Sequence, residues 1–161
     1  MTDLSRELVL HNPGEGEALS ILGWQRQVVL RAEQTGGRLA LVEGRFPAGA
    51  DGPPAHRDGH DELFIVTEGE VRFQLEDRVT QAPAGTTIFI PEGTLHTFKN
   101  EDGGPARIIG AFLPGGYERY FEAIAQLTNS KTPDFAELAE LAARFGTTYV
   151  GPPIWTRQQQ P

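Results

Sequence analysis

Cysteine is absent from this sequence of 161 residues, and histidine occurs only four times. The absence of cysteine excludes disulfide bonds, thiolate metal ligands and cysteine nucleophiles, so any metal chemistry must use histidine, aspartate or glutamate. Basic residues are also few, with 14 Lys and Arg against 22 Asp and Glu and a formal net charge of -8. Because no cluster of basic residues breaks this acidity, nucleic acids and anionic membranes are not expected as partners.

Long apolar segments are missing as well. No stretch approaches the roughly 20 apolar residues that a membrane-spanning helix needs, and the N-terminus carries acidic residues where a signal peptide begins with basic ones. We therefore expect a cytoplasmic protein. The length suits one domain with a substantial core, and we expect a single domain over residues 1–161.

Short apolar runs alternate with turn residues between residues 37 and 113. Turn signals fall at Gly69, Asp77, Gly85 and Gly93, and this spacing suits short strands joined by tight turns. The pattern predicts an all-β fold, an antiparallel β-barrel or jelly roll, built from the runs RLALVEGRF, LFIVTEG, VRFQLED, TTIFIPEG, LHTFKNEDGG and ARIIGAFLPGG.

Two helices are expected after the last strand. The stretch YERYFEAIAQL, which begins at Tyr117, places its aromatic and apolar residues on one helical stripe. A second helix is predicted to start at Thr132, with Thr132 as N-cap and Pro133 in the first turn, and to end at Gly146. We therefore expect a helical segment over about 117–146 that packs against the barrel or against a partner subunit.

The most specific pattern is G-x5-P-x-G-x2-H-x3-N, formed by Gly85, Pro91, Gly93, His96 and Asn100. Gly85, Pro91, Gly93 and Asn100 are residue types typical of turns, and these four need no further role. The histidine is different, because strand alternation places it on the same face as the apolar residue two positions later. It therefore points into the barrel if that face is the inner one.

Three candidate ligands lie upstream, in the segment GPPAHRDGHDELFIVTEG, namely His56, His60 and Glu62. Asp58-Gly59 is a signal for a β-hairpin turn, which predicts that His56 and Glu62 lie on neighbouring antiparallel strands. A loop of two residues would turn His56 away from the interior. A loop of three residues would direct all three candidates inward, and we favour this register.

With His96, the favoured register brings three imidazoles and one carboxylate to a single point. This donor set suits a first-row divalent ion with room for a further ligand, and Fe, Ni, Mn, Cu and Zn are all compatible. In a second interpretation the barrel binds no metal, with His56 and His60 in a surface loop and Glu62 hydrogen-bonded. Asp58 is a minor alternative ligand, and His11 is expected to be exposed.

The two motifs resemble those of the cupin superfamily, whose small β-barrels hold a metal ion by histidines and a carboxylate. The first family motif has two histidines one residue apart, then a glutamate and, after six further residues, a glycine. His56, Glu62 and Gly69 match this motif, whereas Asp58 stands in the place of the second histidine. The segments PGGYERYFEAIA and ELAARFGTTYVGPP are similar to single-domain bacterial cupins that resemble quercetin 2,3-dioxygenase.

The resemblance implies a metal-dependent dioxygenase that cleaves a flavonol-like or enediol aromatic substrate with O2. Glu62 would then be both ligand and catalytic base, and His56, His60 and His96 would be metal ligands. Family habit also suggests a homodimer. A pocket for a flat aromatic molecule could be lined by inward apolar residues, the candidates being Phe64, Val66, Phe73, Phe89, Phe98 and Phe112.

Two other functions fit the same fold, because a fold alone does not determine function. The first is a non-catalytic small-molecule-binding cupin; the sequence shows no helix-turn-helix beside the barrel, which argues against a transcription factor. The second is a metal-dependent isomerase or hydrolase of a sugar or small acid. The phenylalanine-rich strands are a poor lining for such a polar substrate.

Overall fold

The computed structural model describes residues 6, 8–101 and 103–157. The strands in this part of the chain are β1 (Glu17–Ile21), β2 (Trp24–Leu30), β3 (Ala40–Phe46), β4 (Ala55–Asp58), β5 (Asp61–Glu68), β6 (Glu70–Leu75), β7 (Arg78–Pro83), β8 (Thr87–Ile90), β9 (His96–Asn100), β10 (Ala106–Leu113) and β11 (Thr147–Gly151). The helices are the 3-10 helix η1 (Ala32–Gln34), α1 (Glu118–Ser130), α2 (Phe135–Ala143) and α3 (Ile154–Arg157).

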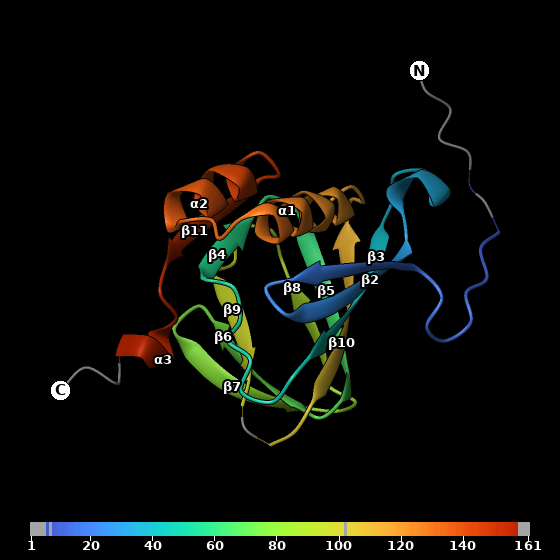
Figure 1. Cartoon of the computed structure of the whole chain (residues 1–161). Coiled ribbons are helices and arrows are strands. Elements are labelled where there is room, and N and C mark those ends of the chain that lie inside the picture. The colour runs from blue at the N-terminus through green and yellow to red at the C-terminus, as the bar shows by residue number, and fades with distance from the viewer. Residues whose placement is uncertain (1–5, 7, 102, 158–161) are drawn as a thin grey trace.

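The strands form two antiparallel sheets that face each other around the core (Figure 1). One sheet has the order β1-β2-β3-β10-β5-β8, and the other has the order β11-β4-β9-β6-β7. This arrangement is a jelly roll, as the spacing of turn signals predicted. The short strands β4, β7 and β11 complete the second sheet and were not among the predicted apolar runs.

Strand alternation places the core residues between the sheets. Val71 and Phe73 of β6 are fully buried, and Phe98 of β9 is also buried, so the inner face of β9 is the one that carries His96. The prediction for Phe89 is wrong: it is 58% exposed, while Ile90, its neighbour on β8, is buried. Because successive side chains of a strand point to opposite faces, the inward position of Ile90 turns Phe89 to solvent.

The predicted hairpin between β4 and β5 does not form. β4 pairs with β9 and β11, whereas β5 pairs with β10 and β8 in the other sheet. The chain therefore crosses between the sheets at Gly59, whose N–H donates to the carbonyl of Gly146 at 3.0 Å. Neither of the two loop registers considered above exists, because both required β4 and β5 to be direct neighbours.

The helices α1 and α2 cover one end of the barrel (Figure 1). The predicted stripe of α1 is buried there, with Tyr120, Phe121 and Ile124 in the same core cluster as the strands. The start of α2 differs from the prediction, because Asp134 is the N-cap and forms a capping box with Glu137. None of the helices in the described ranges is long and apolar enough to cross a membrane.

Candidate metal centre

Two histidines from paired strands form the centre of the site. His56 of β4 lies directly opposite His96 of β9, and the centroids of their rings are 4.3 Å apart. Nδ1 of His56 lies 2.7 Å from the carbonyl of Pro54, and Nδ1 of His96 lies 3.0 Å from that of Thr94. Since a carbonyl can only accept, each Nδ1 donates, and each Nε2 faces the site as a potential ligand.

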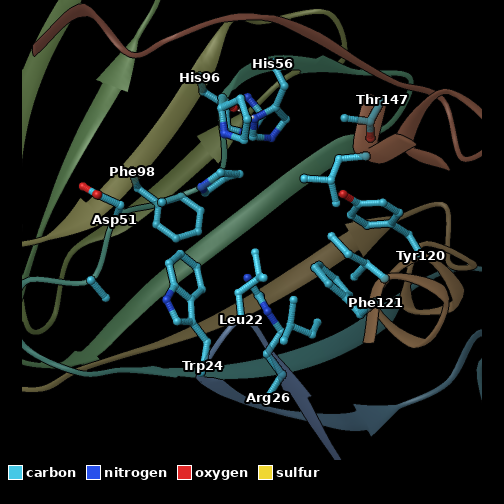
Figure 2. A pocket seen from close by; sticks show the side chains of 18 of the residues that line it. Leu22, Trp24, Arg26, Asp51, His56, His96, Phe98, Tyr120, Phe121 and Thr147 are labelled. Atoms are coloured by element: carbon cyan, nitrogen blue, oxygen red, sulfur yellow. Dashed lines mark hydrogen bonds between the residues drawn. The ribbon is translucent and has the colours of Figure 1, made fainter. Parts of the chain in front are cut away.

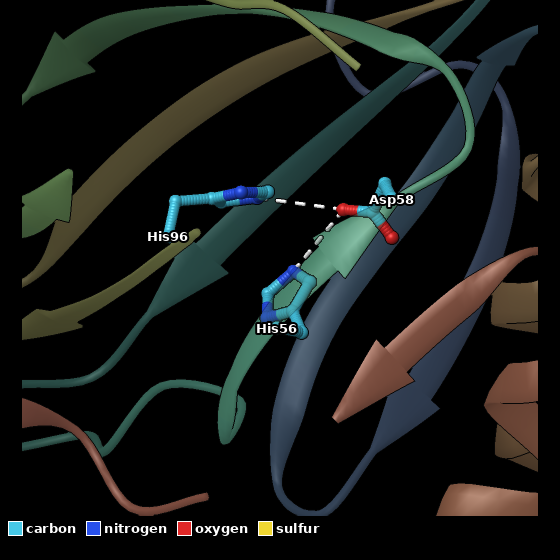
Figure 3. Close-up of side chains that lie close together, drawn as sticks. All are labelled: His56, Asp58 and His96. Atoms are coloured by element: carbon cyan, nitrogen blue, oxygen red, sulfur yellow. Dashed lines mark ion pairs between the residues drawn. The ribbon is translucent and has the colours of Figure 1, made fainter. Parts of the chain in front are cut away.

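Two carboxylates meet these imidazoles. Oδ2 of Asp58, at the end of β4, lies 3.3 Å from Nε2 of His56 and 3.5 Å from Nε2 of His96 (Figure 3). Glu62 of β5 approaches from the opposite sheet, with Oε2 2.8 Å from Nε2 of His96 and Oε1 3.3 Å from Nε2 of His60. All five side chains are buried.

Several donor atoms of this cluster lack a partner for their lone pairs or protons. Oδ2 of Asp58, Oε2 of Glu62 and Nε2 of His96 are buried and make no hydrogen bond of good geometry to any described residue. Buried polar atoms of this kind normally have a partner, and a shared cation would provide one. Two sets of donor atoms are close enough to hold a metal ion, His56, Asp58 and His96, and Asp58, His60 and Glu62.

The electrostatics of the cluster keep both carboxylates ionised. Burial alone would raise the pKa of Asp58, but the facing His56 and the hydroxyl of Thr147 outweigh it and lower the pKa to about 2. Burial opposes ionisation of Glu62 in the same way, and the imidazoles of His60 and His96 hold its pKa below the usual value. Burial favours neutral His96, yet the facing Glu62 raises the pKa of His96.

A chain of hydrogen bonds fixes the orientation of Asp58. Thr147 of β11 donates its hydroxyl proton to Oδ1 of Asp58. The hydroxyl of Tyr117 lies 2.7 Å from Oγ1 of Thr147 and must donate, because the proton of Thr147 is already used. Such outer contacts leave Oδ2 as the free oxygen that faces the histidines.

The cluster opens into a cavity of about 580 Å³. His56, Glu62 and His96 reach its wall, and Figure 2 shows the two histidines across the cavity from Trp24 and Arg26. The volume lies in the range of small-molecule sites, which are mostly apolar with a few polar groups. The aromatic residues of the wall are Trp24, Phe64, Phe98, Phe112, Tyr117, Tyr120, Phe121 and Tyr149.

The structure brings the predicted residues His56, His60, Glu62 and His96 together although their predicted hairpin is absent. It also places Asp58, the minor alternative, at the centre. His60 meets the cluster through Glu62 and Asp58 and does not line the cavity. The centroid of its ring lies 4.2 Å from that of Tyr117.

His11 is exposed, as expected. Asn100 is a structural residue, as expected, because its amide donates to the carbonyls of Phe46, Pro47 and Gly104. Sequence reasoning missed Thr147, since a single threonine in the run TTYVG carries no signal of its function.

Residues 42–112 match the family model described as a cupin domain. The chain is also similar to the quercetin 2,3-dioxygenase of Bacillus subtilis (strain 168), with 23% identity over 111 residues that cover 69% of this chain and 33% of that protein. The chain therefore spans about a third of the length of this curated relative.

Solved structures with the same fold include an RmlC-like cupin from Shewanella frigidimarina NCIMB 400, with a TM-score of 0.60, 22% identity and coverage of 71% of this chain and 97% of that one. The polyketide cyclase RemF from Streptomyces resistomycificus has a TM-score of 0.58 and 19% identity, and the match covers 66% of this chain and 80% of that one. At these identities the likeness establishes a shared fold and leaves the activity open.

Proposed function

We propose that this chain, whose residues 42–112 match a cupin domain, is a metal-dependent dioxygenase of the quercetinase-like type, acting on a flavonol-like or enediol aromatic substrate. The observation that carries the proposal is the set of buried, unpartnered donor atoms of Asp58, Glu62 and His96 at the wall of an aromatic cavity. The named relative among curated proteins supports the choice of reaction.

The proposed ligands are His56, His60, Glu62 and His96, with Asp58 as a fifth donor in the place of the second histidine of the family motif. Histidine nitrogen and carboxylate oxygen together suit Fe, Ni, Mn, Cu or Zn. A bound divalent ion would supply a Lewis acid that makes an enol hydroxyl of the substrate more acidic.

The protein's own groups provide the rest of the chemistry. Glu62 is ionised and reaches the cavity, so it can accept the proton that an enol hydroxyl releases. His60 and His96 hold the two oxygens of this carboxylate in place. Trp24, Phe98 and other rings exclude water and present apolar faces to a flat substrate.

Oxygen consumption tests the proposal directly. The metal-loaded protein should consume O2 when quercetin is added, and Glu62→Gln should lower the rate by at least about a hundredfold, which is the lower range for loss of a general base. His96→Ala should abolish both bound metal and oxygen uptake, whereas His11→Ala, which changes an exposed histidine, should leave both unchanged. Stoichiometric metal without oxygen uptake would contradict the proposed reaction.

A non-catalytic binding cupin is the second candidate, and one observation favours it. Glu62 lies 2.8 Å from His96, and Asp58 lies near both His56 and His96, so the opposite charges already neutralise one another in part. Elemental analysis of the purified protein separates the two functions. Stoichiometric metal that is lost in His96→Ala supports the enzyme, whereas little metal in both proteins supports the binder.

A further inference from the structure

Arg26 carries a positive charge into the wall of the cavity. It lies on β2 between Trp24 and Val28, and strand alternation places all three on one face. Val28 is buried in the core, so this is the inner face of the sheet. Figure 2 shows Arg26 and Trp24 on the side of the cavity opposite His56 and His96.

The guanidinium group of Arg26 is surrounded by aromatic rings. Its central carbon lies 4.5 Å from the ring centroid of Phe121, 5.4 Å from that of Trp24 and 5.8 Å from that of Phe46. These contacts stabilise the positive charge by cation–π attraction. A ring face does not replace a carboxylate or carbonyl as a hydrogen-bond acceptor, and the guanidinium has five N–H donors to satisfy.

The guanidinium of Arg26 has no acceptor among the side chains and carbonyls of the described residues. No ion pair or side-chain hydrogen bond joins it to them, and its Nε is buried without a partner. Other arginines in the same part of the chain pair with glutamates, namely Arg31, Arg45, Arg57, Arg72, Arg107, Arg119 and Arg144.

The charge of Arg26 persists at neutral pH. Burial lowers the pKa of Arg26 to about 10, partly offset by the nearby hydroxyls of Tyr120 and Tyr117 and by the Glu62 carboxylate. Arg26 is half-buried in this apolar wall, where a charge without a partner is destabilising. The missing partner of Arg26 is therefore expected to arrive with the molecule that fills the cavity.

We propose that Arg26 binds a carboxylate of the ligand, so that the cavity takes a compact aromatic carboxylic acid. The planar fork of a guanidinium matches a carboxylate in a bidentate pair. A monoanion fits best, because Arg26 is the one Lys or Arg that lines the described cavity wall. The aromatic walls accommodate the ring of such an acid. The position of the acid's other end at the metal centre depends on the proposed function. Recognition of its carboxylate by Arg26 does not depend on it.

Calorimetry with a matched pair of probes tests this proposal. Cinnamate and cinnamamide have nearly the same shape, but only cinnamate carries the charge. With the full chain stripped of metal by a chelator, cinnamate should bind about tenfold more tightly than cinnamamide. Equal binding of the two probes, or no binding of cinnamate at millimolar concentration, would overturn the proposal.

Variants of Arg26 locate the effect. Arg26→Met keeps an unbranched apolar stem without the charge and should remove the preference for cinnamate while cinnamamide binding is retained. Arg26→Lys keeps the charge without the fork and should retain part of the preference, which also guards against misfolding of the first variant. Arg45→Met, at an exposed arginine, is the matched control and should behave as the unmodified protein. A preference for cinnamate that persists in Arg26→Met would contradict the proposal that Arg26 binds the carboxylate.

The test separates this inference from the proposed enzyme. The preference for cinnamate should persist in His96→Ala, in which the metal centre is broken. If quercetin supports no oxygen uptake but the preference is present, the proposed reaction fails and the role of Arg26 stands. If oxygen uptake is present and the two probes bind equally, the role of Arg26 fails and the proposed reaction stands.

Discussion

Asp58 gives the candidate metal site a second carboxylate. It stands where the first family motif has a second histidine, so the cluster has two carboxylates, and a divalent ion would be neutralised by its own ligands. Carboxylate oxygen is a harder donor than imidazole nitrogen, which shifts the preference towards harder ions such as Mn and Fe. The same carboxylate is held on its other side by Thr147.

Replacement of single donor residues should show how much each one contributes to metal affinity. We expect Asp58→Ala to weaken metal binding by at least about tenfold, because its free Oδ2 faces both His56 and His96. His60→Ala should have a smaller effect, since His60 does not reach the cavity. Competition with a chromogenic chelator measures both affinities. A larger loss in His60→Ala than in Asp58→Ala would show that the ion lies on the Glu62 side of the cluster.

Among the strands, β11 connects the C-terminal part of the chain to the site. It pairs with β4, and through Thr147 it holds Asp58 and contacts Tyr117, which precedes α1. The geometry of the carboxylate therefore depends on a strand that follows both helices in the sequence.

Replacement of Thr147 tests this connection. Thr147→Val keeps the shape of the side chain but leaves buried Asp58 and Tyr117 without their common partner, so the free energy of unfolding should fall by about 1–3 kcal/mol. Metal affinity should fall by about tenfold. Thr148→Val is the matched control, because Thr148 is the next residue of β11 and is exposed. Urea denaturation and chelator competition measure the two effects, and equal results for both variants would contradict the role of Thr147.

The loop before β4, at Gly52 and Pro53, packs closely against the backbone of β9. A Cβ atom added to Gly52 would lie 1.4 Å from the carbonyl oxygen of Phe98, and the hydroxyl of Thr97 donates to the carbonyl of Pro53 at 2.6 Å. Glycine is required at position 52 for space, because any side chain would push this loop away from the strand that carries His96.

Gly52→Ala should therefore be strongly destabilising. A methyl group that meets backbone on a central strand cannot be accommodated by a side-chain rotation, and we expect a loss of about 3 kcal/mol or more in the free energy of unfolding. Gly103→Ala is the control, since a Cβ there would meet open space. Thermal denaturation compares the two variants, and a Gly52→Ala protein as stable as the unmodified one would show that the close approach can relax.

Local sequence patterns predicted which segments form strands and helices more accurately than they predicted which strands pair with one another. Alternation and turn residues predicted the apolar strands and the jelly roll, because both signals depend on neighbours in the sequence. The Asp58-Gly59 hairpin failed because β4 is held by β9 and β11, and the contact between Asp58 and Thr147 spans 89 residues. The predicted N-cap of α2, Thr132, lies two residues too early, because the capping box between Asp134 and Glu137 makes Asp134 the N-cap.

In the whole molecule, the cavity combines parts that no sequence motif connects. β2 supplies Arg26, the loop before β4 supplies one wall, and α1 supplies Tyr120 and Phe121. The proposed ligands His56, Glu62 and His96 could be predicted because histidine and glutamate are rare on inner faces and these three follow a family spacing. Arg26 could not, because an arginine in the run WQRQVVL is usually exposed, and only the assembled barrel shows that it lines the cavity with its Nε buried and without a partner.

The stability of the whole protein should depend on pH in opposite ways with and without metal. In the metal-free protein, the raised pKa of His96 means that its ion pairs stabilise the fold below the unfolded value of about 6.5 and are lost as pH rises through the folded pKa. The lowered pKa of Asp58 stabilises the fold above about 3.8, and this contribution is lost as pH falls towards about 2. We therefore expect greatest metal-free stability between these limits.

Metal binding should reverse the upper part of this dependence. The ligands must be deprotonated to bind a cation, so the stabilisation by a bound ion should grow as His96 loses its proton. We expect the increase in thermal midpoint caused by saturating Zn(II) to be larger at about pH 8 than at about pH 6, and to disappear in His96→Ala at both pH values. Differential scanning fluorimetry in chelator and in Zn(II) measures it. An increase that is equal at both pH values, or larger at the lower one, would show that His96 does not exchange its proton for the metal.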